Sequence, residues 1–156
     1  MKIFVVHKKD YKKLSEFLLK YKNYGFNFWM NRFELWWDDN PAFQANYPRG
    51  WYIEENDIIV GFLGNIPTKM VVNNVVETVF SATSWFVLPS HRSMSIHLFI
   101  KWNTQTENHI CFNTTATANV QKILTAFKFR KWPENDLKLY FIPINFKNLA
   151  IYKIGN

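Results

Sequence analysis

The stretch from Trp85 to His97 places polar and basic side chains directly after an apolar run. It reads Trp-Phe-Val-Leu-Pro-Ser-His-Arg-Ser-Met-Ser-Ile-His, and Pro89 marks the change. This pattern predicts a strand that ends near Pro89 and a helix that begins near Arg92. The first amide groups of a helix lack partners within it and lie at its positive end, so such a turn can bind an anion. The same pattern also fits an ordinary strand-to-helix turn that is capped by Ser90.

Other reactive side chains are few and scattered. Cys111 is the single cysteine, which excludes an internal disulfide framework and favours a reducing compartment. One cysteine and four histidines do not have the spacing of a zinc site, so we expect no metal. His109 and Cys111 alternate along an expected strand and share one face of it. A buried cysteine is more often a core residue than a nucleophile.

The composition is that of a globular protein with a basic surface. The 156 residues carry a net charge of +7, and 48% of them are apolar. The longest apolar runs are far shorter than the roughly 20 residues that span a bilayer. The first residues form a short apolar run followed by lysines, which favours a buried strand over a signal peptide. We therefore expect a cytoplasmic protein without a membrane span.

The positive charge is compatible with several partners. Nucleic acid, an acidic membrane surface and a polyphosphate ligand all fit a charge of +7, and so does a solvated surface without an anionic ligand. The lysines are spread along the chain and form no basic tail, so charge alone does not choose. Signatures of the RRM, KH and helix-turn-helix modules are missing, and the aromatic residues fall at core spacing, which disfavours nucleic acid.

The first forty residues predict one strand and two helices. We expect a strand over Lys2–Val6 and an amphipathic helix over Lys8–Lys22, because apolar residues recur there every three or four positions. Gly25 is predicted to end this helix. A second helix is expected over Asn27–Trp37. The dipeptide Asn40-Pro41 stops it, since the residue before a proline is pushed out of the helical region.

The remaining sequence predicts two hairpins and then alternating helices and strands. Trp51–Glu54 and Ile58–Asn65 form the first hairpin, and Pro67 is predicted to interrupt the chain before the second. That second hairpin turns at Asn73-Asn74 and continues to Leu88. The later elements are a helix over Arg92–Trp102, a strand over His109–Phe112, a helix over Ala118–Phe127, and strands over Leu137–Phe146 and Leu149–Ile154. This order predicts one α/β (α+β) domain over residues 1–156, with a mixed, largely antiparallel sheet flanked by helices.

The order of elements, and above all the stretch from Trp85 to His97, resembles the GNAT superfamily of acyl-CoA N-acyltransferases. Its members have a strand that ends in Val-x-Pro, an aromatic-like position, and Arg-x-x-Gly-x-Gly/Ala at the start of a helix. The residues in register with that pattern are Val87, Pro89, His91 and Arg92. Ser95 and His97 stand where the family has glycine or alanine. The resemblance implies a GNAT-like fold and acetyl-CoA, or another acyl-CoA, as co-substrate.

The resemblance also implies roles for individual residues. A backbone amide among Phe86, Val87 and Leu88 would polarise the thioester carbonyl. The diphosphate would be held by Arg92, Ser93, Met94, Ser95, Ile96 and His97, and the pantetheine arm by Asn119. Glu77 is the best-placed carboxylate for a general base, or else a solvent-facing residue near the start of its strand. The tyrosine that often protonates the leaving group is missing, because no tyrosine lies between Tyr52 and Tyr140.

Three further segments match the family less specifically. Gly50–Phe62 looks like its central hairpin, and Asn113–Phe129 looks like its last helix. Phe33–Pro41, together with Ser84-Trp85, resembles GNAT-like proteins of bacterial surface-polysaccharide and cell-envelope synthesis. Four tryptophans fall where the family forms its acceptor pocket, and most of them are expected in the core: Trp29, Trp36, Trp37 and Trp51.

The sequence therefore favours an acyl-CoA-dependent N- or O-acyltransferase. It would transfer acetyl from acetyl-CoA to an amine or hydroxyl of a small molecule or a saccharide precursor, and a homodimer is compatible with it. A catalytically degenerate GNAT domain that binds CoA or another ligand is an alternative, supported by Ser95, His97 and the missing tyrosine. A basic nucleic-acid-binding module is the second alternative.

Overall fold

The structure, a computed structural model, describes residues 1–106, 108–114 and 116–131. The chain divides into two compact units, Met1–Thr115 and Ala116–Asn156, and each is described by itself. The single domain expected over residues 1–156 stays a prediction.

The elements of the first unit follow one another as the sequence predicts. The strands are β1 (Lys2–Val5), β2 (Gly50–Glu55), β3 (Ile58–Val72), β4 (Val75–Val87) and β5 (Ile110–Phe112). The helices are α1 (Tyr11–Tyr21), α2 (Phe26–Phe33) and α3 (Ser95–Gln105). Three short helical turns join them: the 3₁₀ turn η1 (Lys8–Asp10), the π-helical turn η2 (Glu34–Asp38) and the 3₁₀ turn η3 (Pro89–Met94).

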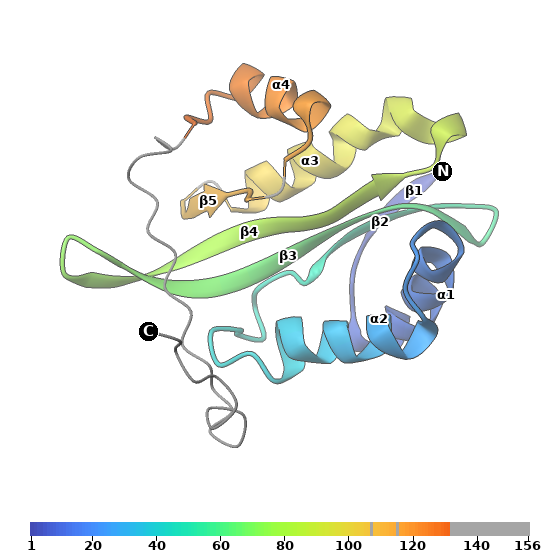
Figure 1. The fold of residues 1–156 in the computed structure, drawn as a ribbon, viewed down its shortest axis with the longest axis horizontal. Helices are drawn as coiled ribbons and strands as arrows, with labels where there is room; N and C mark the ends of the chain where they lie inside the picture. Colours follow the sequence, from blue (N-terminus) through green and yellow to red (C-terminus); the bar gives the residue numbers. More distant parts are fainter. Residues whose placement is uncertain (107, 115, 132–156) are drawn as a thin grey trace, which may run out of the picture. The chain divides into compact units, whose positions relative to one another are not determined.

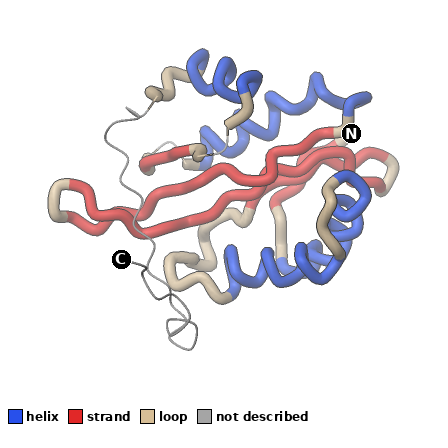
Figure 2. The backbone as a smooth tube through the Cα atoms, in the orientation of Figure 1, coloured by secondary structure: helices blue, strands red, loops and turns tan. Residues whose placement is uncertain are grey.

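The strands form one mixed sheet in the order β1-β2-β3-β4-β5 (Figure 2). Neighbours from β1 to β4 are antiparallel, and β5 is parallel to β4. Figure 1 shows α1 and α2 on one face of the sheet and α3 on the other. The predicted fold class, a mixed and largely antiparallel sheet flanked by helices, is therefore confirmed.

Each face of the sheet carries its own apolar core, because side chains alternate between the two faces along a strand. The α1 and α2 face buries Leu14, Leu18, Phe33, Trp37 and Phe62, among others. On the opposite face Trp85 of β4 stacks on Phe99 of α3, with ring centroids 5.3 Å apart. Burial of a large apolar side chain contributes roughly 1.5–3 kcal/mol, so both cores hold the centre of the sheet firmly.

The prediction that Pro67 interrupts the sheet is wrong. Strand β3 runs without a break from Ile58 to Val72, and Pro67 lies opposite Phe80 of β4. Because β2 pairs with β3 only as far as Gly64, no strand within the described residues pairs with the other edge of β3 at Pro67. A proline is tolerated at such an edge, where its missing N–H is not needed. Its carbonyl oxygen instead accepts a hydrogen bond from Asn40 Nδ2 at 2.9 Å.

The two helices on the first face match their predicted positions with one correction. Helix α2 continues through η2 and ends at Asp38, just before Asn40-Pro41, as predicted. Gly25, however, does not end α1, which already stops at Tyr21. Gly25 is extended (φ −68°, ψ 165°) and directly precedes α2, which is the usual conformation of the residue before a helix.

The second unit is described from Ala116 to Lys131. It contains α4 (Ala118–Ala126), preceded by an extended Thr117, close to the predicted helix. The strands predicted over Leu137–Phe146 and Leu149–Ile154 lie outside the described residues. Of the helices in residues 1–106, 108–114 and 116–131, none combines the length and apolar character needed to cross a membrane.

Candidate cofactor site

Strands β4 and β5 pair over a short stretch and leave the rest of β4 open. The parallel ladder begins at Val79 and ends where Ser81 pairs with Phe112, whereas β4 continues to Val87. Within the described part of the first unit, the edge of β4 from Ala82 to Val87 that faces β5 therefore has no strand partner. Backbone N–H and C=O groups on such an edge need partners and can pair with an extended ligand.

A β-bulge interrupts β4 in the middle of this open edge. The register shifts so that Ser84 and Trp85 together face the single residue Leu63 of β3. Ser84 has a φ of 49°, which is uncommon for a residue other than glycine. Gly64 beside the bulge is tightly packed, since a Cβ there would lie 2.8 Å from Thr83 Cγ2. Bulges redirect the backbone locally and are frequent beside functional sites.

The chain leaves β4 through a turn that hydrogen bonds hold in place. Leu88 N–H donates to the carbonyl oxygen of Val60 at 2.8 Å, which fixes the turn to β3. His91 N–H donates to Leu88 O at 2.9 Å and starts the 3₁₀ winding of η3. Ser95 N–H donates to Arg92 O where η3 passes into α3. The helical segment thus begins at Pro89, slightly earlier than predicted.

The residues predicted to bind the cofactor, apart from Asn119, lie along this turn. They are Phe86 and Val87 at the end of β4, Leu88 after it, Arg92, Ser93 and Met94 in η3, and Ser95, Ile96 and His97 in the first turn of α3. Arg92, Ser93 and His97 are exposed. Among the residues that the structure describes, no acidic side chain forms an ion pair with Arg92. The turn therefore presents basic and hydroxyl groups beside an open strand edge.

Several solved acetyltransferase structures are similar to this chain in fold. No family model matches the chain, and no curated protein matches its sequence. A predicted acetyltransferase from Clostridium acetobutylicum, solved with acetyl-CoA, is similar with a TM-score of 0.67 and 14% identity, over 89% of this chain and 95% of that one. Glucosamine-6-phosphate N-acetyltransferase from Arabidopsis thaliana gives 0.60 and 14%, over 90% and 98%. Ribosomal-protein-alanine N-acetyltransferase from Brucella melitensis gives 0.58 and 12%, over 92% and 99%.

The chain has the GNAT acetyltransferase fold. At 12–14% identity the likeness concerns the fold alone, and the acceptors named for the Arabidopsis and Brucella proteins differ. In this GNAT fold the open edge of β4, its bulge and the turn into α3 belong to one continuous segment.

One of the predicted site residues of the first unit, Glu77, is not brought to this segment, and Asn119 belongs to the second unit. Glu77 lies on β4 roughly 20 Å before Ser84, at about 3.3 Å per residue. Its exposed side chain lines an open hollow near the tip of the β3–β4 hairpin, together with Thr78, His109 and others. Asn119 is exposed in α4 of the second unit. The roles assigned to both residues stay predictions.

Glu55 is a site residue that sequence reasoning missed. It is the last residue of β2, and its Oε2 lies 2.9 Å from His91 Nε2. Ser90 Oγ lies 2.8 Å from the other ring nitrogen, Nδ1. The hydrogen bond from His91 lowers the pKa of Glu55 below its ordinary value. No spacing in the sequence links Glu55 to His91, and only the position of the β2–β3 turn in the GNAT sheet brings them together.

Cys111 and His109 lie at β5. The Cys111 thiol is half-buried and donates to Thr106 O, with Sγ and O 3.5 Å apart. Burial raises the pKa of this thiol, which disfavours the reactive thiolate. His109 packs its ring edge-on against Phe80, with ring centroids 4.9 Å apart. These contacts fit the interpretation of Cys111 as a packing residue.

The four tryptophans of the expected acceptor region separate into core and surface residues. Trp29, Trp37 and Trp51 are almost completely buried, as expected for most of them. Trp36 is half-buried in η2. The guanidinium of Arg32 lies 5.7 Å from its ring centre and 5.1 Å from that of Phe28. Trp36 is thus the member of this set with a ring surface that a ligand can reach.

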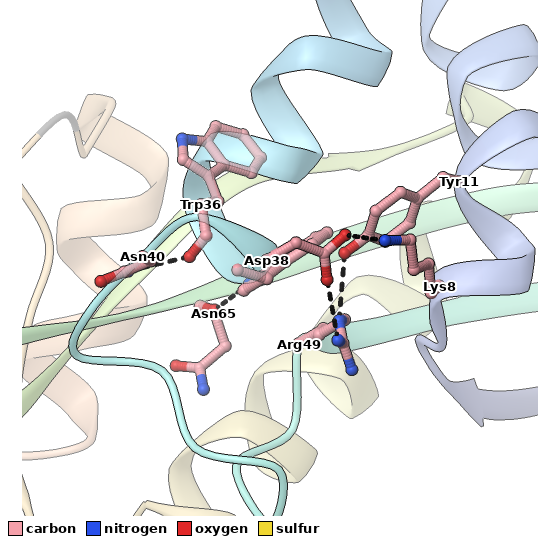
Figure 3. A network of polar contacts seen from close by, with 8 residues as sticks. Lys8, Tyr11, Trp36, Asp38, Asn40, Arg49 and Asn65 are labelled. Carbon is pink, nitrogen blue, oxygen red and sulfur yellow. Dashed lines mark hydrogen bonds and ion pairs between the residues drawn. The ribbon is translucent and has the colours of Figure 1, made fainter.

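A polar network on the α1 and α2 side of the sheet fixes the loop between η2 and β2 (Figure 3). Arg49 donates from Nη2 to Asp38 at 3.1 Å and from Nε to the Tyr11 hydroxyl at 3.0 Å, while Lys8 pairs with Asp38 at 3.1 Å. Burial raises the pKa of Asp38, but the bonds from Lys8 and Arg49 outweigh it and hold that pKa below its ordinary value. Burial raises the pKa of Tyr11 to about 12. These charges are paired with each other, so the network is a structural support.

Asn65 connects this support to both faces of the sheet. Its backbone oxygen accepts from Trp37 Nε1 at 2.7 Å, and its side-chain oxygen accepts from Trp102 Nε1 at 2.9 Å. Its Nδ2 donates to Pro48 O at 2.8 Å. Asn65 has no solvent exposure, and a buried amide that is hydrogen-bonded in this way stabilises one arrangement of the segments around it.

Proposed function

We propose that this protein is an acetyl-CoA-dependent acetyltransferase. The observation that carries the proposal is the bulged, open edge of β4 that leads directly into the turn of η3 and α3. The fold that contains this segment is shared with an acetyltransferase solved with acetyl-CoA. The acetyl acceptor would be an amine or hydroxyl group of a small molecule, and saccharide precursors are the class to test first. A cytoplasmic location follows from the need for acetyl-CoA.

The residues present along β4 and η3 fit such a ligand. Bound acetyl-CoA supplies a thioester whose acetyl group can pass to a nucleophile. The unpaired edge from Ala82 to Val87 would bind the amides of the pantetheine arm as a neighbouring strand does. A backbone N–H of Phe86 or Val87 would stabilise negative charge on the thioester carbonyl oxygen, whereas that of Leu88 is bonded to Val60 O. Arg92 and the hydroxyl groups of Ser93 and Ser95 would bind the diphosphate.

Much of the rate enhancement would come from positioning. Holding two reactants in line removes a large part of the entropic barrier, and this needs a rigid site more than a special catalytic group. The two packed faces of the sheet and the Leu88–Val60 bond provide that rigidity here. This role for positioning agrees with the lack of a tyrosine in α4.

A GNAT domain that binds CoA without catalysis is the second candidate. Three observations favour it: His97 stands at a glycine position of the family pattern, the Ser95 amide is bonded to Arg92 O, and α4 has no tyrosine. A homodimer stays a prediction for either candidate.

Binding of acetyl-CoA, measured by titration calorimetry, is the first test. We expect the variant Arg92→Ala, Ser95→Glu to weaken binding by at least about tenfold, since it removes a cation and adds a carboxylate beside the diphosphate. The matched control is Lys101→Ala, Thr104→Glu, which makes the same changes at exposed residues further along α3. The control should bind like the wild type. Equal weakening in both variants, or no binding by the wild type at millimolar acetyl-CoA, would sink the proposal.

Turnover then separates the two candidates. Release of free CoA thiol is followed with a panel of amines, amino sugars and hydroxyl acceptors. Acceptor-dependent release that is lost in the Arg92→Ala, Ser95→Glu variant supports the enzyme. Tight acetyl-CoA binding without release for any acceptor favours the binding domain instead.

A further inference from the structure

Three side chains form a hydrogen-bonded chain across the turn of the candidate cofactor site. Ser90 and His91 belong to η3, whereas Glu55 lies 36 residues before His91, at the end of β2. Ser90 Oγ and Glu55 Oε2 lie 2.8 Å and 2.9 Å from the two ring nitrogens of His91. Because both nitrogens are engaged, the orientation of the imidazole ring is fixed.

The fold brings these groups together at one end of the sheet. Asn56 and Asp57 form a tight turn after Glu55, with φ values of 49° and 63°. The bond from Leu88 N–H to Val60 O holds the start of η3 against the neighbouring part of β3. The turn that carries Arg92 is therefore held at two points, by this backbone bond and by the Glu55–His91 contact.

The ring can keep this geometry in either charge state. When His91 is neutral, the Ser90 hydroxyl donates to Nδ1 and Nε2–H donates to Glu55. When His91 is protonated, Nδ1–H donates to the Ser90 oxygen and the bond to Glu55 becomes an ion pair. Only the hydroxyl hydrogen of Ser90 rotates, so one positive charge can be added to the turn without moving heavy atoms.

The surroundings keep the carboxylate ready for this ion pair. The bond from His91 lowers the pKa of Glu55, so Glu55 is ionised wherever a histidine titrates. The side chain of His91 is 19% exposed and that of Glu55 is 40% exposed, so solvent reaches the ion pair from the Glu55 side. Other charged groups at this end of the sheet are Arg92, Asp57, the Lys13–Glu54 ion pair and the amino group of Met1.

We propose that Glu55 and His91 link the binding of the CoA diphosphate to the uptake of a proton. The bound diphosphate would favour protonated His91, and Glu55 would hold the ring in place to receive the proton. This inference rests on the proposed function of the same turn. A nearby anion favours the charged imidazole, and by linkage the protonated ring strengthens binding of the anion equally. Affinity should therefore rise as the pH falls through the histidine range.

The test uses dephospho-CoA, which keeps the diphosphate but lacks the 3′-phosphate that itself titrates near pH 6. Binding is measured by calorimetry at about pH 6 and about pH 8. Two buffers of different ionisation enthalpy report the protons taken up. We expect the wild type to bind about fivefold more tightly at the lower pH, with uptake of a fraction of a proton, since full linkage gives roughly tenfold per pH unit.

Four variants assign the effect to residues. His91→Gln keeps an amide beside Glu55 but cannot take up a proton, so its affinity should be nearly the same at both pH values. Glu55→Gln should also bring the affinities at the two pH values closer together. Lys13→Gln breaks the ion pair with Glu54, the residue before Glu55 on β2. This variant should keep the wild-type ratio of the affinities at the two pH values. His109→Gln, which removes an exposed histidine beside β5 that has no assigned role in the site, should keep it too.

The outcomes separate this inference from the proposed function. Wild-type pH dependence in His91→Gln, or its loss in His109→Gln, overturns the inference while acetyl-CoA binding stands. No binding of dephospho-CoA or acetyl-CoA at either pH overturns both. A measurement on the unmodified protein checks the same point: by NMR, the titration midpoint of the His91 ring should move to higher pH when dephospho-CoA is added. An unmoved midpoint contradicts the proton link.

Discussion

Tyr11 is a buried hydroxyl whose ionisation the fold opposes. The residue is 2% exposed, burial raises its pKa to about 12, and the bond from Arg49 only partly offsets this. An unfolded tyrosine titrates near pH 10. Below about pH 10 both states hold the proton and the stabilisation is complete. Between about pH 10 and 12 the unfolded state loses its proton first, so stability falls as the pH rises.

We therefore expect the wild type to lose stability relative to Tyr11→Phe over this range. At neutral pH the variant should be less stable by roughly 1–2 kcal/mol, because Arg49 loses an acceptor. That difference should shrink as the pH rises from about 10 toward 12. Urea unfolding at a series of pH values measures it. A difference that is constant up to the alkaline end of the series would contradict the role of burial.

Contacts at the residue scale follow from sequence only where they are local. Arg92, Ser95 and His97 belong to one contiguous motif, so their common position along the turn could be predicted. The contact of His91 with Glu55 joins segments 36 residues apart and depends on where the β2–β3 turn ends. Asn65 was predicted at the end of the strand Ile58–Asn65, but nothing in the sequence indicated that its amide is buried between Pro48 O and Trp102.

The close approach of β2 to β3 requires a glycine at position 50. It opens β2 with a φ of 145°, and a Cβ there would lie 2.4 Å from the backbone oxygen of Leu63. Backbone cannot move aside as a flexible side chain can. We expect Gly50→Ala to lower the free energy of unfolding by roughly 2–4 kcal/mol, through strain and displacement of β2 from β3.

Gly25→Ala is the matched control for this substitution. Gly25 has a φ of −68°, and no atom lies within 4 Å of the point that an alanine methyl group would occupy, so the cost should stay within about 1 kcal/mol. Urea unfolding of both variants and the wild type measures the two costs. Equal stability of the two alanine variants would show that the approach of β2 to β3 at Gly50 is looser than the structure indicates.

The elements were predictable where local chemistry decides them. Asn56-Asp57 and Asn73-Asn74 adopt positive φ in tight turns, a conformation that asparagine and aspartate tolerate well, and both hairpins were predicted. Pro67 was misjudged because its effect depends on the neighbouring strand. Since β2 ends at the Gly50–Gly64 pair, β3 is an edge strand of the described sheet beyond that pair, and a proline is harmless at such an edge.

The net positive charge is a property of the whole molecule and acts on anionic ligands. A net charge of +7 attracts any anion over long distances, including nucleic acid and CoA. Such attraction is screened by salt, with a Debye length of about 10 Å at 0.1 M. The net charge could not identify the partner from sequence, because it does not say where on the protein an anion binds. The fold gives that position by placing Arg92 beside an open strand edge. The salt dependence of ligand binding can therefore distinguish attraction by the net charge, the general field, from binding at a local site.

We expect acetyl-CoA binding to weaken by a few-fold between about 50 and about 300 mM salt, because part of the attraction to its phosphates is screened. Arg92→Ala, Ser95→Glu and its control Lys101→Ala, Thr104→Glu each remove one positive charge and add one negative charge. Both therefore lower the net charge by two, from +7 to +5. If the general field bound the ligand, both would weaken binding equally, and the loss would vanish at high salt. A local site predicts a loss for the first variant alone that persists at high salt.

A short single-stranded oligonucleotide, titrated in parallel, tests the nucleic-acid alternative. Binding through the general field should be weak, steeply dependent on salt, and equally reduced in both double variants, because each phosphate contact releases counterions wherever it forms. It should also leave acetyl-CoA bound, since a distributed field does not compete for one turn. An oligonucleotide that displaces acetyl-CoA, and whose binding is lost only in Arg92→Ala, Ser95→Glu, would instead make the turn of η3 a nucleic-acid site. The acetyltransferase proposal would then fail at the segment on which it rests.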